Sequence, residues 1–277
     1  MSGPVPLRLR PLEVGDLLDE TFRIYRRNFA LFAGISVILA IPQAVLAGYL
    51  SFSALDMFTQ LATPAQPVDL GRLEGVLAAE LIALLIEVAL APFLYGAVTY
   101  AAGEAAQGRA VTAAGVIRGV LGRYFQILGY LALFVGMGIL FCLFPLWIWI
   151  GVGWVAVIPI MFIENAGLGA AMGRSRHLVQ GSWWRTFLIL FLMFIIILFV
   201  NLALSAFAGL AEGLIGIFAA SAVVAAVATG ARVLVQSLVN PAFQILIVLI
   251  YFDLRVRREG LDLFQLAQRV LPPAPAV

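Results

Sequence analysis

The sequence predicts an all-α, polytopic membrane protein with six transmembrane helices. Its 277 residues are 63% hydrophobic and only 12% charged, and the mean hydropathy is +1.06, whereas about a quarter of an average soluble chain is charged. Long uncharged stretches separate the charges. Such stretches can cross a hydrocarbon core of about 30 Å, for which a helix needs about 20 apolar residues. This composition excludes a disordered chain, a disulfide scaffold and a nucleic-acid-binding protein, so no nucleic-acid partner is expected.

Six apolar runs define the expected spans. The third and fourth come from one continuous run that is too long for a single crossing, with a tight turn expected near residues 144–153. The expected spans are residues 29–52, 76–101, 126–144, 147–163, 186–208 and 233–253. They form a single membrane domain over residues 1–270, followed by a Pro-rich tail at residues 271–277.

The segment 209–230 is harder to interpret, because it is apolar but rich in Ala and Gly and interrupted by Glu212. We interpret it as an interfacial or re-entrant segment, and a seventh crossing is the alternative. All 17 basic residues are arginines. With six spans and a cytoplasmic N-terminus, only Arg72 and Arg232 lie outside, as the positive-inside rule requires. Both termini are therefore expected in the cytoplasm.

Three short amphipathic helices are expected on the cytoplasmic side, at residues 12–28, 111–125 and 168–184. In the first helix one face carries a stripe of large apolar residues at helical spacing, namely Leu18, Phe22, Tyr25 and Phe29. Such a helix is expected to lie in the headgroup plane with this face toward the acyl chains.

Each amphipathic helix precedes a pair of spans, and the second span of each pair contains one proline: Pro92, Pro159 or Pro241. A proline inside a span removes a backbone hydrogen bond and is expected to kink the helix. The pattern is compatible with a pseudo-threefold repeat of an amphipathic helix plus a helix pair.

Three stretches carry a resemblance to a known family: RPLEVGDLLDETFRIYRRNF at the start, GRSRHLVQGSWWRTF in the middle and LIYFDLRVRREGLDL near the end. The chain resembles bacterial integral membrane proteins named after the membrane domain of some glycerophosphoryl diester phosphodiesterases. The resemblance implies a stand-alone six-helix domain in the bacterial cytoplasmic membrane. The hydrolase itself is a barrel of about 250 residues, whereas only 19 residues follow Arg258. Phosphodiesterase activity is therefore not expected.

Two carboxylates in the second span are candidates for an intramembrane polar site. Glu80 and Glu87 are seven residues apart, so they share one helix face. A carboxylate at the bilayer centre costs about 2.5–3.5 kcal/mol on insertion scales, so it needs a partner, a proton or a watery cavity. Two interpretations remain open: a proton, cation or headgroup site, or a structural carboxyl bonded to Asn201, Ser205 or a free carbonyl.

The cytoplasmic arginines are the second candidate site, for an anionic phospholipid or an acidic partner. Guanidinium groups suit phosphate geometry, and each is attracted to an anionic leaflet by about 1 kcal/mol. Ordinary positive-inside topology, without a ligand, is the alternative. The candidate residues are Arg23, Arg26, Arg27, Arg118, Arg123, Arg174, Arg176 and Arg185.

Several other polar and aromatic residues are expected to have structural roles. We expect Glu164 and Asn165 to cap the end of a span, and Asp253 to pair locally with Arg255. His177 has no ligand-type neighbours at metal-binding spacing, so no metal and no cofactor are expected. Aromatic belts at the two membrane surfaces would place Trp147, Trp149 and Trp154 at the outer surface and Trp183 and Trp184 at the inner one.

The function that best fits these features is non-enzymatic: an integral membrane scaffold or accessory subunit that binds lipids or a partner membrane complex. Expected partners are a bilayer with anionic phospholipids, other membrane subunits or further copies of the chain. A transporter or permeation pathway for a lipid or small solute, using Glu87, is the alternative. No catalytic residues are identified.

Overall fold

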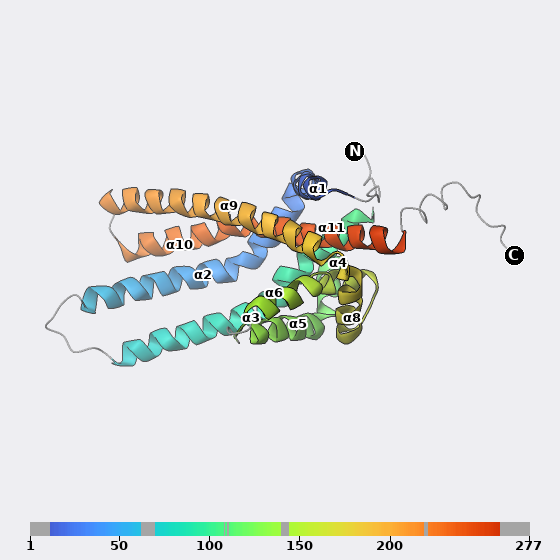
Figure 1. Cartoon of the computed structure of the whole chain (residues 1–277). Coiled ribbons are helices and arrows are strands. Elements are labelled where there is room, and N and C mark those ends of the chain that lie inside the picture. Colours follow the sequence, from blue (N-terminus) through green and yellow to red (C-terminus); the bar gives the residue numbers. More distant parts are fainter. Residues whose placement is uncertain are drawn as a thin grey trace. The chain divides into compact units, whose positions relative to one another are not determined.

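A computed structural model describes residues 12–61, 70–107, 109, 111–139, 144–218 and 221–260, and these residues form helices without a strand. The helices appear in Figure 1. They are α1 (Val14–Arg27), α2 (Phe29–Leu61), α3 (Leu70–Ala106), α4 (Ala113–Leu121), α5 (Tyr124–Ile139), α6 (Phe144–Gly153), α7 (Val157–Ile163), α8 (Leu168–Val179), α9 (Trp183–Phe218), α10 (Ala222–Ser237) and α11 (Asn240–Glu259).

The all-α, polytopic membrane class is confirmed by the length and apolarity of these helices. Five segments qualify as membrane spans, and six do so when α4 and α5, which are bent by 64° at a short break, count as one. The five segments are Phe29–Ser53, Glu74–Ala106, Pro145–Ile163, Trp183–Leu214 and Ala222–Glu259. The three expected amphipathic helices correspond to α1, α4 and α8.

The chain divides into two compact units, and α3 and α9 contribute residues to both. Unit 1 comprises Met1–Asn28, Tyr95–Met193 and Ala242–Val277, and unit 2 comprises Phe29–Leu94 and Phe194–Pro241. The charges divide unequally, because unit 1 holds every arginine except Arg72 and Arg232. Unit 2 exposes large apolar side chains along its helices, as lipid-facing helices do.

In unit 2, α2 and α10 are antiparallel and pack closely through small residues. A Cβ atom added at Gly48 would lie 2.9 Å from the carbonyl oxygen of Ala226, and one added at Gly230 would lie 3.0 Å from that of Ala44. Small residues allow membrane helices to approach this closely. A hydrogen bond of 3.2 Å from Thr229 Oγ1 to Ser51 Oγ joins the same two helices.

The segment 209–230 is shared between two helices, and its interfacial or re-entrant placement stays a prediction. Its first part continues α9 to Phe218, and its last part opens α10, whose N-cap Ser221 accepts a hydrogen bond from the Val224 N–H. The 36 residues of α9 correspond to a length of about 54 Å. This helix therefore extends further than the expected span 186–208.

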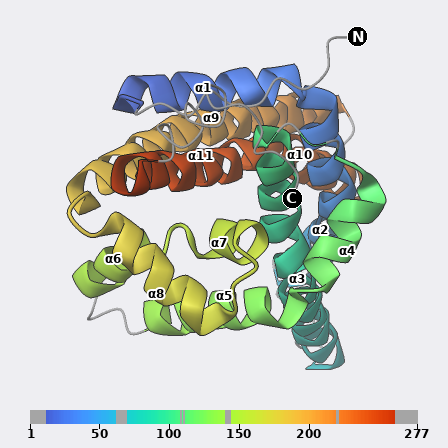
Figure 2. The same cartoon turned by 90° about the vertical axis from the view of Figure 1, so that its right-hand side faces the viewer.

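In unit 1, helices α5–α8 pack together (Figure 2) around a break between α6 and α7. The buried Ser175 of α8 donates to the Gly153 carbonyl at 2.9 Å and accepts the Ala156 N–H at 3.1 Å. Tyr130 Oη donates to the Trp154 carbonyl at 3.1 Å. Irregular backbone at membrane depth is tolerated where protein satisfies its polar groups, and these two side chains do so here.

Two of the three expected proline kinks are wrong, and the kink at Pro92 stays a prediction. Pro92 lies inside α3, as does Pro42 in α2. Pro159 and Pro241 instead lie in the first turns of α7 and α11, where the N–H that proline lacks has no helical partner in any case. These two prolines therefore mark helix starts rather than kinks, and the expected span 233–253 is divided between α10 and α11.

The close approach of α2 and α10 can be tested by adding a methyl group. We expect Gly48→Ala to destabilise the protein by about 1–3 kcal/mol, because overpacking a tight contact forces the backbones apart. Gly34→Ala in the same helix is the matched control, since an added Cβ there has nothing within 4 Å. Thermal unfolding of both variants in the same detergent measures the difference, and equal stability of the two would contradict the packing.

Candidate functional site

The charged end of α11 is the centre of the polar interactions in unit 1. Residues four apart share a helix face, so Tyr251, Arg255 and Glu259 lie on one face, and Asp253 and Arg257 lie on another. Both sets belong to the stretch LIYFDLRVRREGLDL. Each face binds a different group of neighbouring elements.

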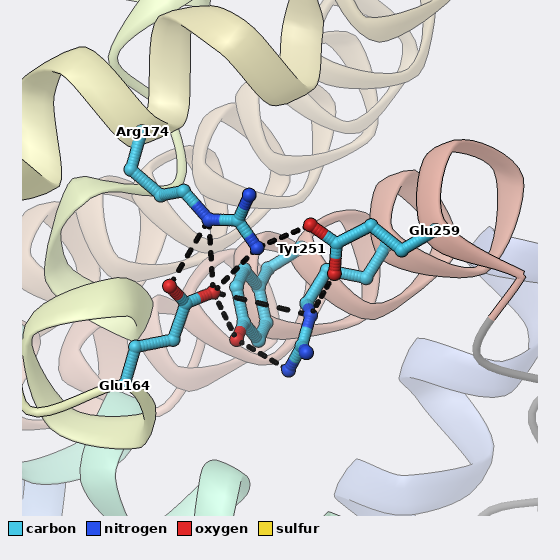
Figure 3. Close-up of polar contacts among 5 residues, drawn as sticks. Glu164, Arg174, Tyr251 and Glu259 are labelled. Carbon is cyan, nitrogen blue, oxygen red and sulfur yellow. Dashed lines mark hydrogen bonds and ion pairs between the residues drawn. The ribbon is translucent and has the colours of Figure 1, made fainter. Parts of the chain in front are cut away.

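The first face joins α7, α8 and α11 through a network that we call the Glu164 network, consisting of Glu164, Arg174, Tyr251, Arg255 and Glu259 (Figure 3). Arg174 Nε donates to Glu164 Oε2 at 3.0 Å, and its Nη2 donates to Glu259. Tyr251 Oη donates to Glu164 Oε1 at 2.9 Å and accepts from Arg255 Nη1 at 3.0 Å. Arg255 also pairs with Glu259 at 2.9 Å. The five side chains therefore satisfy one another.

The second face holds the backbone that precedes α1, in an arrangement that we call the Asp253 clamp. The carboxylate of Asp253 accepts the Leu12 N–H at 3.0 Å, Arg185 Nη1 at 2.6 Å and Arg257 Nε at 3.1 Å. The same two arginines donate to the Leu12 carbonyl, each at 2.6 Å. Both polar groups of the Leu12 backbone are thus bound, by side chains from α9 and α11.

The Asp253 clamp and the Glu164 network differ in how deeply their side chains are buried. The Asp253 side chain is 1% exposed, whereas Glu164, Arg174, Arg255 and Glu259 are 22–30% exposed. Burial lowers the pKa of Arg174, but its hydrogen bonds to Glu164 and Glu259 and the charges of these carboxylates outweigh that effect, so the pKa lies above its ordinary value. A buried carboxylate without its cations would cost folding free energy. Losing a partner should therefore destabilise the protein more in the Asp253 clamp than in the Glu164 network.

The Glu164 network and the Asp253 clamp both hold helices in position, and together we call them the frame. The carboxylates of both are occupied by guanidinium, hydroxyl or amide donors, which fixes the ends of α7, α8, α9 and α11 and the start of α1. Within the part of the chain that the structure describes, no group of three or more His, Cys, Asp or Glu side chains could hold a metal ion.

The structure divides the candidate arginines into two groups, all in unit 1. Four have partners within the protein: Arg23 bonds to Glu20, Arg123 to Asn165 and the Ala166 carbonyl, Arg174 to Glu164 and Glu259, and Arg185 to Asp253 and Leu12. The other four, Arg26, Arg27, Arg118 and Arg176, are exposed residues. The second group retains the donors that an anionic ligand would need.

The intramembrane candidates Glu80 and Glu87 lie in the part of α3 that belongs to unit 2, and both are exposed. The large apolar residues around them, among them Leu81, Leu84 and Leu85, are more than half exposed as well. A polar site at these two carboxylates stays a prediction.

One expectation for an individual residue needs correction. Asp253 pairs with Arg185 and Arg257 rather than with Arg255, because a residue two positions along a helix faces away. Glu164 is the C-cap residue of α7, and its side chain also binds Arg174 and Tyr251, while Asn165 binds Arg123.

The tryptophans expected at opposite membrane surfaces are neighbours. Trp183 Nε1 donates to the Trp149 carbonyl at 3.1 Å, so a belt assignment by position in the chain is wrong for this pair. In α1, the fully buried residues are Leu17 and Thr21, whereas Leu18, Phe22 and Tyr25 of the expected stripe are half-buried. The protein-facing side of α1 is therefore rotated from the predicted apolar stripe.

Comparison with known proteins identifies no relative. No family model, no curated protein and no solved structure matches the chain. The resemblance to the membrane domain of glycerophosphoryl diester phosphodiesterases stays a prediction.

The Asp253 clamp can be tested by neutralising its carboxylate. We expect Asp253→Asn to lower stability by about 3–5 kcal/mol, because Arg185 and Arg257 lose the charge that compensates them. Asp19→Asn is the control, since Asp19 is an exposed carboxylate on α1. Thermal unfolding in detergent measures both variants, and a loss below about 1 kcal/mol for Asp253→Asn would argue against the clamp.

The Glu164 network can be tested by removing one hydroxyl. We expect Tyr251→Phe to cost about 1–2 kcal/mol, because Glu164 and Arg255 lose a common hydrogen-bond partner. Tyr49→Phe, at a side chain that is 56% exposed, should change stability by less than about 0.5 kcal/mol. Combining Tyr251→Phe with Glu164→Gln should cost less than the sum of the single changes, and strict additivity would show that the two side chains do not interact.

Proposed function

We propose that the protein is a non-enzymatic integral membrane scaffold or accessory subunit of a bacterial cytoplasmic membrane. Its termini face the cytoplasm, and the exposed arginines of unit 1 bind anionic phospholipids or an acidic surface of a partner membrane protein. The unequal use of the arginines carries this proposal. Arg123, Arg174 and Arg185 bind other parts of the protein, whereas Arg26, Arg27, Arg118 and Arg176 remain on the surface.

The surface around Arg118 supports a membrane-facing role for this group. Helix α4 buries Val116 and Val120 against the protein, and on its other side Ile117 and Leu121 are 52% and 57% exposed. Phe125, at the start of α5, is 82% exposed. An arginine flanked by exposed apolar side chains is typical of a helix at the headgroup boundary, where the apolar residues enter the acyl layer and the cation meets phosphate.

The free energy that each arginine contributes is small, so it suits weak retention of lipid rather than tight binding. Each arginine near an anionic leaflet contributes about 1 kcal/mol, and salt screens that attraction. Four exposed arginines together would produce a marked preference for anionic over zwitterionic lipids. The rigid frame beneath them would keep their positions fixed.

The proposal predicts the lipids that accompany the protein. The protein, reconstituted in nanodiscs of mixed phosphatidylglycerol and phosphatidylcholine and then released for native mass spectrometry, should retain mainly phosphatidylglycerol. Changing Arg26, Arg27, Arg118 and Arg176 together to Gln should reduce that preference at least about tenfold, given about 1 kcal/mol for each. Arg232→Gln in unit 2 is the control and should leave it unchanged. Equal retention of both lipids by the unaltered protein would refute the proposal.

A further inference from the structure

One exposed arginine, Arg176, lies over the ring of Trp149 in α6, and the main chain of Trp149 adjoins a cluster of aromatic side chains on α9. We call this group the aromatic shelf, and it consists of Trp149, Trp183, Trp184, Phe187 and Phe191. Trp183 Nε1 bonds to the Trp149 carbonyl at 3.1 Å. The Trp183 ring packs edge-to-face on Trp184 with centroids 4.8 Å apart, and it stacks on Phe187 at 5.4 Å. Phe187 stacks on Phe191 at 5.8 Å. The four rings of α9 are therefore in contact with one another, and Trp149 joins them through its main chain.

The outer members of the shelf are accessible. Trp184 is 77% exposed and Trp149 is 47% exposed, while Leu188 and Phe191 are 45% and 46% exposed. Trp184, Leu188 and Phe191 follow one another at helical spacing along α9, so they share a face. This face forms an apolar strip that runs along α9 from Trp184 to Phe191.

Arg176 supplies a cation beside Trp149. Its guanidinium carbon lies 5.3 Å from the centre of the Trp149 ring, in cation–π geometry. Two residues earlier in α8, Arg174 is bound by Glu164 and Glu259. Among the described residues no carboxylate pairs with Arg176, so the ring orients its guanidinium while leaving the N–H donors for a ligand.

A second guanidinium lies at the turn between α8 and α9. Arg258 Nη2 is 3.3 Å from the position that a Cβ of Gly181 would occupy, and Gly181 has a φ of +82°. Arg258 is exposed, and the turn begins where the Gln180 N–H bonds to the Arg176 carbonyl at 3.0 Å. Glycine at this position permits the positive φ and also leaves room for the guanidinium of Arg258.

We propose that this surface is a binding site for one anionic glycerophospholipid. Its phosphate binds Arg176, with Arg258 adding positive charge at the turn, and an acyl chain lies along Trp184, Leu188 and Phe191. A phosphate alone would leave the apolar strip unused, and an uncharged lipid would leave the cation unused. The inference deepens the proposed function and rests on it, because it assigns the lipid preference to one defined place.

The experiment uses the full chain in a neutral detergent, where no charged leaflet attracts lipid in general. Short-chain phosphatidylglycerol is titrated, and native mass spectrometry measures the affinity of the first lipid bound. Arg176→Gln should weaken that affinity at least about tenfold, since charge-assisted hydrogen bonds to phosphate are lost. Arg232→Gln, a control at an arginine of unit 2 outside the candidate group, should change it less than about twofold.

A second pair of variants tests the apolar part of the site. Trp184→Ala should weaken binding of the lipid, whereas Phe207→Ala, which removes a 73% exposed aromatic residue of unit 2, should not. Inorganic phosphate at the same concentration should fail to displace the lipid, and displacement would show a site for free anions instead.

If Arg118→Gln weakens binding as much as Arg176→Gln, the shelf is not the site, although a general preference for anionic lipids stands. If the unaltered protein binds phosphatidylglycerol and phosphatidylcholine equally in detergent and in nanodiscs, the proposed function fails as well.

Discussion

A single buried carboxylate holds unit 1 together. Asp253 is almost completely removed from solvent, so its charge requires hydrogen-bond donors and cations from the protein. These come from Arg185 at the start of α9, Arg257 on α11 and the Leu12 N–H before α1. The opposite face of α11 uses Tyr251 and Arg255 to hold Glu164 and Arg174 in the same way. Helix α11 is thus the element to which α7, α8, α9 and the backbone before α1 are attached.

Arginines that are close in the sequence have different roles in this arrangement. Arg174 and Arg176 are two positions apart on α8, but the first faces carboxylates of α7 and α11, and the second lies on an exposed indole. A count of the arginines expected in the cytoplasm treats them alike, because the positive-inside rule responds to charge and not to contacts. Only the packing of α8 separates the arginine that stabilises the frame from the one that can bind a ligand.

The sequence was sufficient for the features that depend on run length and composition, namely the all-α class, the long apolar helices and the three short amphipathic helices. It was insufficient where a distant side chain decides the backbone. The break between α6 and α7 depends on Ser175, which follows it by about twenty residues and satisfies its free groups. The contact between Trp149 and Trp183 is equally non-local. By contrast, helical spacing alone favours Arg257 over Arg255 as the partner of Asp253, so the sequence is sufficient to predict this pair.

The clamp also imposes an order on biosynthesis. Leu12 and Asp253 are 241 residues apart in the chain, so the ribosome synthesises the partner of the Leu12 backbone only after α1–α10 of the described residues. Until α11 enters the membrane, the Leu12 N–H and carbonyl must be satisfied by water or lipid headgroups, and Arg185 waits without its carboxylate. Closure of unit 1 is therefore a late step in assembly, and a chain stalled before α11 would present an unpaired arginine and a loose α1 to the quality-control proteases of the membrane.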